Sequence, residues 1–172
     1  MTVAAPRGYC IEQSDQPDPG FVLIGTCQGM RLAGIPLPAF TGRARHPAIL
    51  TAAVGLPGTA LPLTGAEAEL TAFFRSADGR AALSRSGQAP LVRVDEARLL
   101  DADRGGVFAL WLTDDSPLPG GQATAEYWRA LMPVRDRMVT LTVTGLRERP
   151  VTRDEGLEVL TDFVAAIRRA NP

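Results

Sequence analysis

The side chains best suited to chemistry in this chain are its two cysteines, Cys10 and Cys27. A structural zinc site needs four protein ligands, and a catalytic thiol needs a histidine or a helix N-terminus nearby. The chain has a single histidine and no third cysteine, which disfavours zinc, and both cysteines lie in predicted strands, which disfavours a catalytic thiol. Two interpretations stay open: two reduced cysteines packed in the core, or a disulfide across a hairpin, whose opposed Cβ atoms lie about 4.5–5.5 Å apart. We favour the disulfide.

The oxidation state of these cysteines indicates the cellular compartment of the protein. A disulfide persists in oxidising surroundings, so a bridge predicts a periplasmic or envelope-associated protein. All 18 basic residues are arginine, which indicates the codon bias of a GC-rich bacterial genome. Met1 stands directly before the first structural segment, without the basic and apolar regions of a signal peptide. We therefore expect the full-length protein to carry an export or anchoring segment that is absent here.

A long irregular loop, residues 28–47, is the second candidate region, because loops of this length are either functional or mobile. Its three arginines, Arg31, Arg43 and Arg45, could bind a carboxylate or a phosphate. The only histidine, His46, lies beside them as a further candidate, with a surface or capping histidine as the alternative. A solvated loop without a ligand is the alternative interpretation of this cluster.

Tyr127 and Trp128 are neighbours on a predicted strand and must point to opposite faces. One of the two rings could reach the surface, and an exposed Trp128 beside Arg129 would suit a contact with a partner protein. Packing in the core is the alternative.

The sequence contains no phosphate-loop, dinucleotide, zinc-protease or hydrolase motif. Its arginines are not interleaved with aromatic residues as nucleic-acid binding requires, and the net charge of −1 gives no field that attracts nucleic acid or an anionic membrane. We therefore expect no metal, no cofactor, no nucleic-acid partner and no enzymatic activity. Contact with a membrane is expected only through the absent leader or anchor.

The length of 172 residues predicts one globular domain spanning 1–172. A short extended piece near residues 9–11 precedes the first long strand. Alternating or continuous apolar runs predict strands at 21–27, 48–55, 91–100, 107–113, 127–134 and 137–145. The run at 107–112 is apolar on both faces, which is typical of a central strand.

Two helical regions are predicted from capping boxes, one at Thr64 and Glu67 and the other at Thr152 and Glu155. The first region carries an apolar stripe at Leu70, Phe73 and Phe74 and breaks at residues 78–79. Hairpin-linked strands with segregated helices predict the α+β class, with a mainly antiparallel sheet.

In this order of elements the chain resembles the PsbP / Mog-type superfamily. The resemblance lies in the opening APRGYCI, the late hairpin YWRALMPVRDRMVTLTVTG and the helix TRDEGLEVLTDFVAAIRR. It implies an α/β/α sandwich, in which helices cover both sides of the sheet and the C-terminal helix packs on it. The resemblance also implies non-catalytic roles in assembly or binding, and it carries over no catalytic residue.

Our leading hypothesis is an exported, non-catalytic module that binds a protein partner or assists assembly of an envelope complex. One alternative is a periplasmic protein that binds a small molecule or an ion through the long loop. Another is a cytosolic chaperone or adaptor of the same fold, which would require reduced cysteines.

Overall fold

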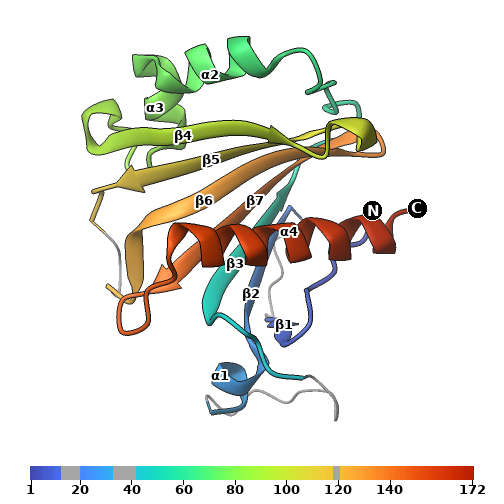
Figure 1. Ribbon diagram of the computed structural model, residues 1–172, viewed down its shortest axis with the longest axis vertical. Helices are drawn as coiled ribbons and strands as arrows, with labels where there is room; N and C mark the ends of the chain where they lie inside the picture. The colour runs from blue at the N-terminus through green and yellow to red at the C-terminus, as the bar shows by residue number, and fades with distance from the viewer. Residues whose placement is uncertain (13–19, 33–41, 118–120) are drawn as a thin grey trace.

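A computed structural model describes residues 1–12, 20–32, 42–117 and 121–172, except for the side chains of residues 31 and 32. Seven strands form one antiparallel sheet in the order β1-β2-β3-β7-β6-β5-β4 (Figure 1). The strands are β1 (Tyr9–Ile11), β2 (Phe21–Thr26), β3 (Ala48–Val54), β4 (Val92–Leu100), β5 (Val107–Asp114), β6 (Ala123–Val134) and β7 (Arg137–Leu146). The helices are α1 (Cys27–Leu32), α2 (Glu67–Arg75), α3 (Ala77–Leu83) and α4 (Arg153–Ala170), with short 3-10 turns at Ala89–Leu91 and Ala102–Arg104. The predicted α+β class is confirmed.

The C-terminal helix α4 lies across one face of the sheet, over β6 and β7 (Figure 1). Its predicted capping box is confirmed: Thr152 Oγ1 accepts from the Glu155 amide at 3.3 Å, and Glu155 Oε2 accepts from the Thr152 amide at 2.8 Å. Leu160, Phe163 and Ile167 are fully buried against the sheet. This apolar stripe holds the helix in place, because burying such side chains contributes roughly 1.5–3 kcal/mol each.

The opposite face of the sheet is covered at the β4 end by α2 and α3. Phe74 of α2 and Leu83 of α3 pack against Phe108 and Leu110 of β5, whereas Trp111 of β5 packs on the α4 side. Every residue of β5 is buried, so the predicted cover on both faces is confirmed. The strand is not central, however, because β5 lies next to the edge strand β4.

The first predicted capping box does not form. Helix α2 begins at Glu67 after Ala66, and no side chain caps it. The break between the two helices falls at Ser76 rather than at residues 78–79, because the Ser76 hydroxyl caps α3 by accepting from the Gly79 amide at 3.2 Å. Of the predicted stripe, Phe74 is buried while Phe73 is exposed. The stripe is narrower than predicted because only one edge of α2 meets the sheet.

The long irregular loop predicted at 28–47 begins as a helix, α1. The preceding strand ends at Thr26, whose hydroxyl accepts from the Gly29 amide at 3.1 Å and so opens the first helical turn. Residues 33–41 lie outside the described part of the chain. Residues 42–47 lead back into β3.

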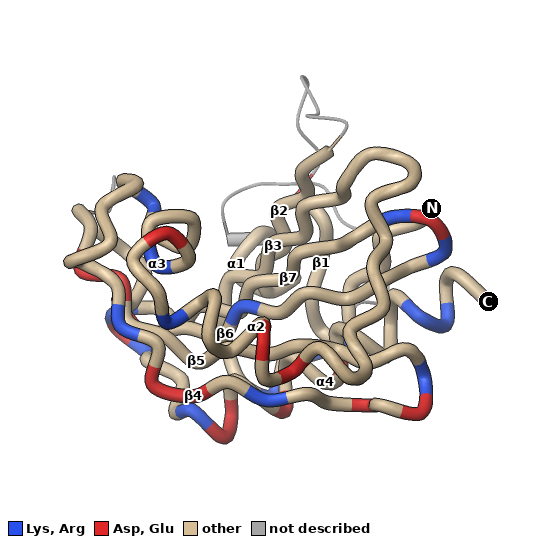
Figure 2. The backbone as a smooth tube through the Cα atoms, turned by 90° about the horizontal axis from the view of Figure 1, so that it is seen from above, with Lys and Arg blue, Asp and Glu red and all other residues tan. Residues whose placement is uncertain are grey.

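Charged residues of both signs are interspersed over the molecule, and arginines alternate with acidic residues along the edge strand β4 (Figure 2). Arg93 pairs with Asp95 at 2.6 Å, and Arg98 with Glu96 at 3.0 Å. Charges on an edge strand oppose pairing with a foreign strand. Within the described ranges, no helix combines the length and apolar character needed to cross a bilayer.

Candidate functional site

The two cysteines form a disulfide between β1 and the first residue of α1, so this prediction is confirmed. The Cα atoms of Cys10 and Cys27 lie 4.9 Å apart, and both residues are buried with Met30 in a small cluster. The bridge therefore fixes the start of α1 to the edge of the sheet. No group of metal-ligating side chains gathers within the described ranges.

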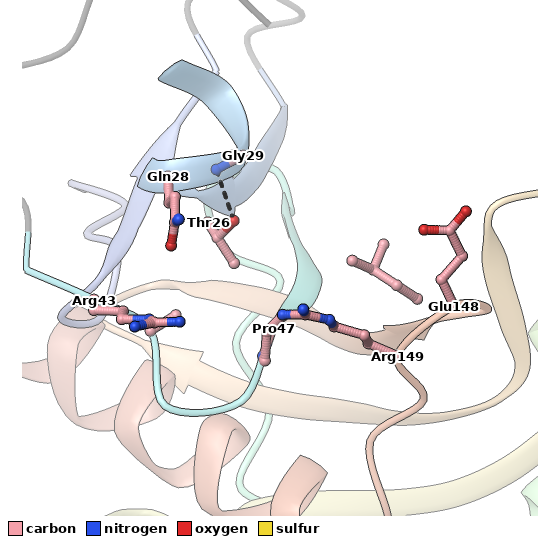
Figure 3. Close-up of a pocket in the computed structure, with 9 residues that line it drawn as sticks. Thr26, Gln28, Gly29, Arg43, Pro47, Glu148 and Arg149 are labelled. Carbon is pink, nitrogen blue, oxygen red and sulfur yellow. Dashed lines mark hydrogen bonds between the residues drawn. The ribbon is translucent and has the colours of Figure 1, made fainter. Parts of the chain in front are cut away.

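Beside α1 lies a cavity of about 400 Å³ that we call the arginine cleft. Helix α1 forms one wall, the segment before β3 a second, and the turn after β7 a third. Its lining residues are Thr26, Gln28, Gly29, Arg43, Ala44, Pro47, Leu146, Glu148 and Arg149. Figure 3 shows the side chains of Arg43 and Arg149 extending toward each other from opposite sides of the cleft, below Gln28.

Within the described part of the chain, the two guanidinium groups of the arginine cleft have no acidic partner. Among the described residues, neither Arg43 nor Arg149 has a carboxylate oxygen within 4.0 Å of its nitrogen atoms. The carboxylate of Glu148 points away from both (Figure 3). Because a guanidinium presents several N–H donors in a planar fork, the pair suits a carboxylate or another oxyanion placed between them.

The backbone on both sides of the cleft is held in place. Gly8 has a φ of +86°, and a Cβ atom there would lie 2.2 Å from the Ala44 nitrogen, so only glycine lets β1 approach the segment that carries Arg43. On the other side the Arg149 amide donates to the Leu146 carbonyl at 3.0 Å. Arg43 and Arg149 thus extend from anchored backbone.

His46 does not line the arginine cleft. Its Nδ1 lies 3.3 Å from Glu155 Oε1, and its Nε2 lies 3.3 Å from Glu158 Oε2. Arg45 also pairs with Glu158, at 3.4 Å. Both predicted cations are therefore engaged with α4, where His46 joins the loop to the helix.

The hydroxyl of Tyr9 donates to the backbone carbonyl of His46 beneath this contact. Burial of the phenol, together with the nearby carboxylate of Asp162, raises the pKa of Tyr9. Tyr9 therefore stays neutral over the physiological range and acts here as a hydrogen-bond donor.

The prediction that one ring of the Tyr127–Trp128 pair reaches the surface is wrong. Trp128 is 0% exposed and Tyr127 is 1% exposed, because α4 covers one face of β6 and the α2–α3 pair covers the other. The Trp128 indole N–H donates to the Arg153 carbonyl at 2.7 Å, which ties β6 to the first turn of α4. Trp128 is a core residue and offers no contact to a partner.

Of the predicted anion-binding residues whose side chains the structure describes, only Arg43 lines the cleft. Arg31 belongs to α1, but its side chain lies outside the described part of the chain. Arg149, in the turn after β7, was not among the residues predicted from the sequence. Arg149 lines the same cleft as Arg43 because β3 pairs with β7, with Ala48 opposite Gly145.

No family model matches the chain, and no curated protein matches it. Among solved structures, the chain is similar to the solution structure of cyanobacterial PsbP (CyanoP) from Synechocystis sp. PCC 6803. The identity is 13%, the match covers 95% of this chain and 81% of that chain, and the TM-score is 0.46. The resemblance to the PsbP / Mog-type superfamily stays a prediction.

Proposed function

We propose that this protein is an exported, non-enzymatic module that binds an acidic segment of a protein partner in the arginine cleft. The observation that carries the proposal is the pair Arg43 and Arg149, two exposed guanidinium groups that face each other without a carboxylate partner among the described residues. Carboxylate recognition by arginine is directional, because one guanidinium can donate two parallel, charge-assisted hydrogen bonds to the two oxygens of one carboxylate.

Two further observations support the proposal. The disulfide between Cys10 and Cys27 fits an oxidising compartment outside the cytosol. The same bridge leaves neither Cys10 nor Cys27 as a free thiol for nucleophilic catalysis.

The test uses the acetylated and amidated peptide Ser-Ser-Ser-Ser-Glu-Glu, titrated into the protein by calorimetry at low salt. We expect Arg43→Gln and Arg149→Gln each to weaken binding by about tenfold, since a hydrogen bond to a charged group contributes roughly 1.5–3 kcal/mol. Arg75→Gln is the matched control, because Arg75 is exposed at the end of α2, remote in the fold from the cleft.

Equal affinity of all three variants would overturn the proposal. Thermal stabilisation by inorganic phosphate or by small carboxylates, without any peptide binding, would instead support the alternative of a small-molecule binder. Higher salt should weaken the peptide complex, because both guanidinium groups are exposed to screening.

A further inference from the structure

The arginine cleft continues into a second cavity of about 320 Å³, which we call the apolar groove. The two cavities share Thr26, Gly29 and Leu146 as lining residues. The groove is further lined by Glu12, Leu23, Ile24, Gly25, Met30, Ala48, Ile49 and Gln122. It lies mostly over β2, β3 and α1, while α2 and α3 pack at the distant β4 end of the sheet.

The groove and the cleft follow one another along the strands. On β2, Leu23 lines the groove and Thr26 lies at the boundary shared with the cleft. On the antiparallel strand β3, Ile49 lines the groove, and Pro47, just before the strand, lines the cleft. A segment lying along these strands would therefore pass from apolar side chains to the two guanidinium groups. An extended chain advances about 3.3 Å per residue and presents every second side chain to one face.

The groove is shallow. Leu23 in its lining is 37% exposed, and polar residues, Glu12 and Gln122, also line it. A lipid acyl chain laid there would keep much of its length in water, whereas a peptide needs to bury only alternate side chains. The geometry therefore favours a protein segment over a lipid.

We propose that the occupant of the two cavities is an extended segment of a protein partner in which alternating apolar side chains lie next to acidic ones. The apolar side chains would contact Leu23, Ile49 and Met30, and the acidic ones would lie between Arg43 and Arg149. This inference rests on the proposed function and names the kind of partner segment that the same site takes.

The test compares three acetylated and amidated peptides: Leu-Ser-Val-Ser-Glu-Glu, the acidic-only Ser-Ser-Ser-Ser-Glu-Glu and the apolar-only Leu-Ser-Val-Ser-Gln-Gln. We expect the first to bind at least about fivefold more tightly than either other peptide, because each buried apolar side chain adds to the charged contacts. In nitrogen-15 spectra it should shift the amides of Leu23 and Ile49 together with those of Gly29 and Arg149.

Two variants locate the apolar contribution. Leu23→Gln should remove the advantage of the first peptide over the acidic-only one, while the acidic-only peptide binds unchanged. Phe21→Gln is the matched control, since Phe21 is 44% exposed on the same face of β2 but does not line the groove, and the advantage should persist.

The outcomes separate this inference from the proposed function. If both acidic peptides bind equally, the groove takes no part and the inference fails while the cleft stands. If no acidic peptide binds, the proposed function fails with it. Decanoate is the lipid probe. If it binds more tightly than the first peptide and shifts the same amides, the occupant is a lipid and the inference is overturned.

Discussion

Cys27 is both the first residue of α1 and the disulfide partner of Cys10 in β1. This one bond therefore connects the edge of the sheet to the helix that walls the arginine cleft. The bridge spans a sequence separation of 17 residues and so also constrains the unfolded chain.

Removing the bridge should weaken both the fold and the site. For the double variant Cys10→Ser with Cys27→Ser we expect a loss of about 3 kcal/mol in the free energy of unfolding, as the loop-closure entropy predicts. Urea unfolding followed by circular dichroism measures this loss. A reducing agent should shift the wild-type midpoint and leave that of the double variant unchanged.

The approach of Gly8 to the segment carrying Arg43 predicts a second effect. Gly8→Ala meets two obstacles, a φ of +86° and a Cβ atom 2.2 Å from the Ala44 nitrogen. Gly58→Ala meets a φ of +79° but open space, so it serves as the matched control for backbone strain alone. We expect Gly58→Ala to lower the free energy of unfolding by about 1–2 kcal/mol, and Gly8→Ala to lower it distinctly more.

The same pair of variants tests the scaffold of the cleft. In nitrogen-15 spectra, Gly8→Ala should move the amides of Arg43 and Ala44, whereas Gly58→Ala should leave them in place. Equal destabilisation by the two variants would contradict the close approach at Gly8.

Asp114 is a buried carboxylate that accepts from the Arg85 amide at 2.8 Å and from the Ser116 amide at 2.9 Å. Burial acts to raise the pKa of Asp114, but the hydrogen bond from the Ser116 side chain, the two backbone hydrogen bonds and the nearby Arg85 guanidinium outweigh it, so the pKa is lowered. Asp114→Ala leaves both amides without an acceptor, and we expect a loss of about 2 kcal/mol or more. Asp115→Ala, at an exposed neighbour, is the control and should change stability by less than about 0.5 kcal/mol.

Glu155 links the capping box of α4 to His46. Hydrogen bonds from the Thr152 amide and hydroxyl, followed by the charge and hydrogen bond of His46, lower the pKa of Glu155. A lowered pKa in the folded state gives stability that is present above the ordinary carboxyl pKa and is lost as the pH falls through the folded value. Glu155→Gln should therefore destabilise the protein at neutral pH, with the difference narrowing in acid.

Chemical denaturation between neutral and acidic pH measures this effect. Glu126→Gln is the control, because Glu126 is exposed on β6 and has no ion pair within 4.0 Å among the described residues. A constant stability difference between wild type and Glu155→Gln at all pH values would contradict the assigned role of the Glu155 charge.

Elements fixed by local contacts are the ones that the sequence predicted correctly. The capping box at Thr152 and the alternation of apolar and polar residues in β7 each depend on residues a few positions apart, so both can be predicted from the sequence. The box at Thr64 has the same pattern, yet it fails because Gly65 has a φ of +85°, which is not helical, and α2 begins at Glu67, two residues later than Thr64 would cap. Helix α1 was missed because its six residues, Cys27–Leu32, are too few to show a helical apolar period.

By itself, the sequence determined the α+β class and most of the strands, because apolar periodicity acts over short distances, and it favoured the disulfide that the structure then showed. Only the tertiary structure decided that Trp128 is buried and that His46 is held by α4, since burial depends on which elements cover a strand. It also decided the candidate site: Arg43 and Arg149 meet because β3 pairs with β7, a long-range contact that neither local sequence encodes.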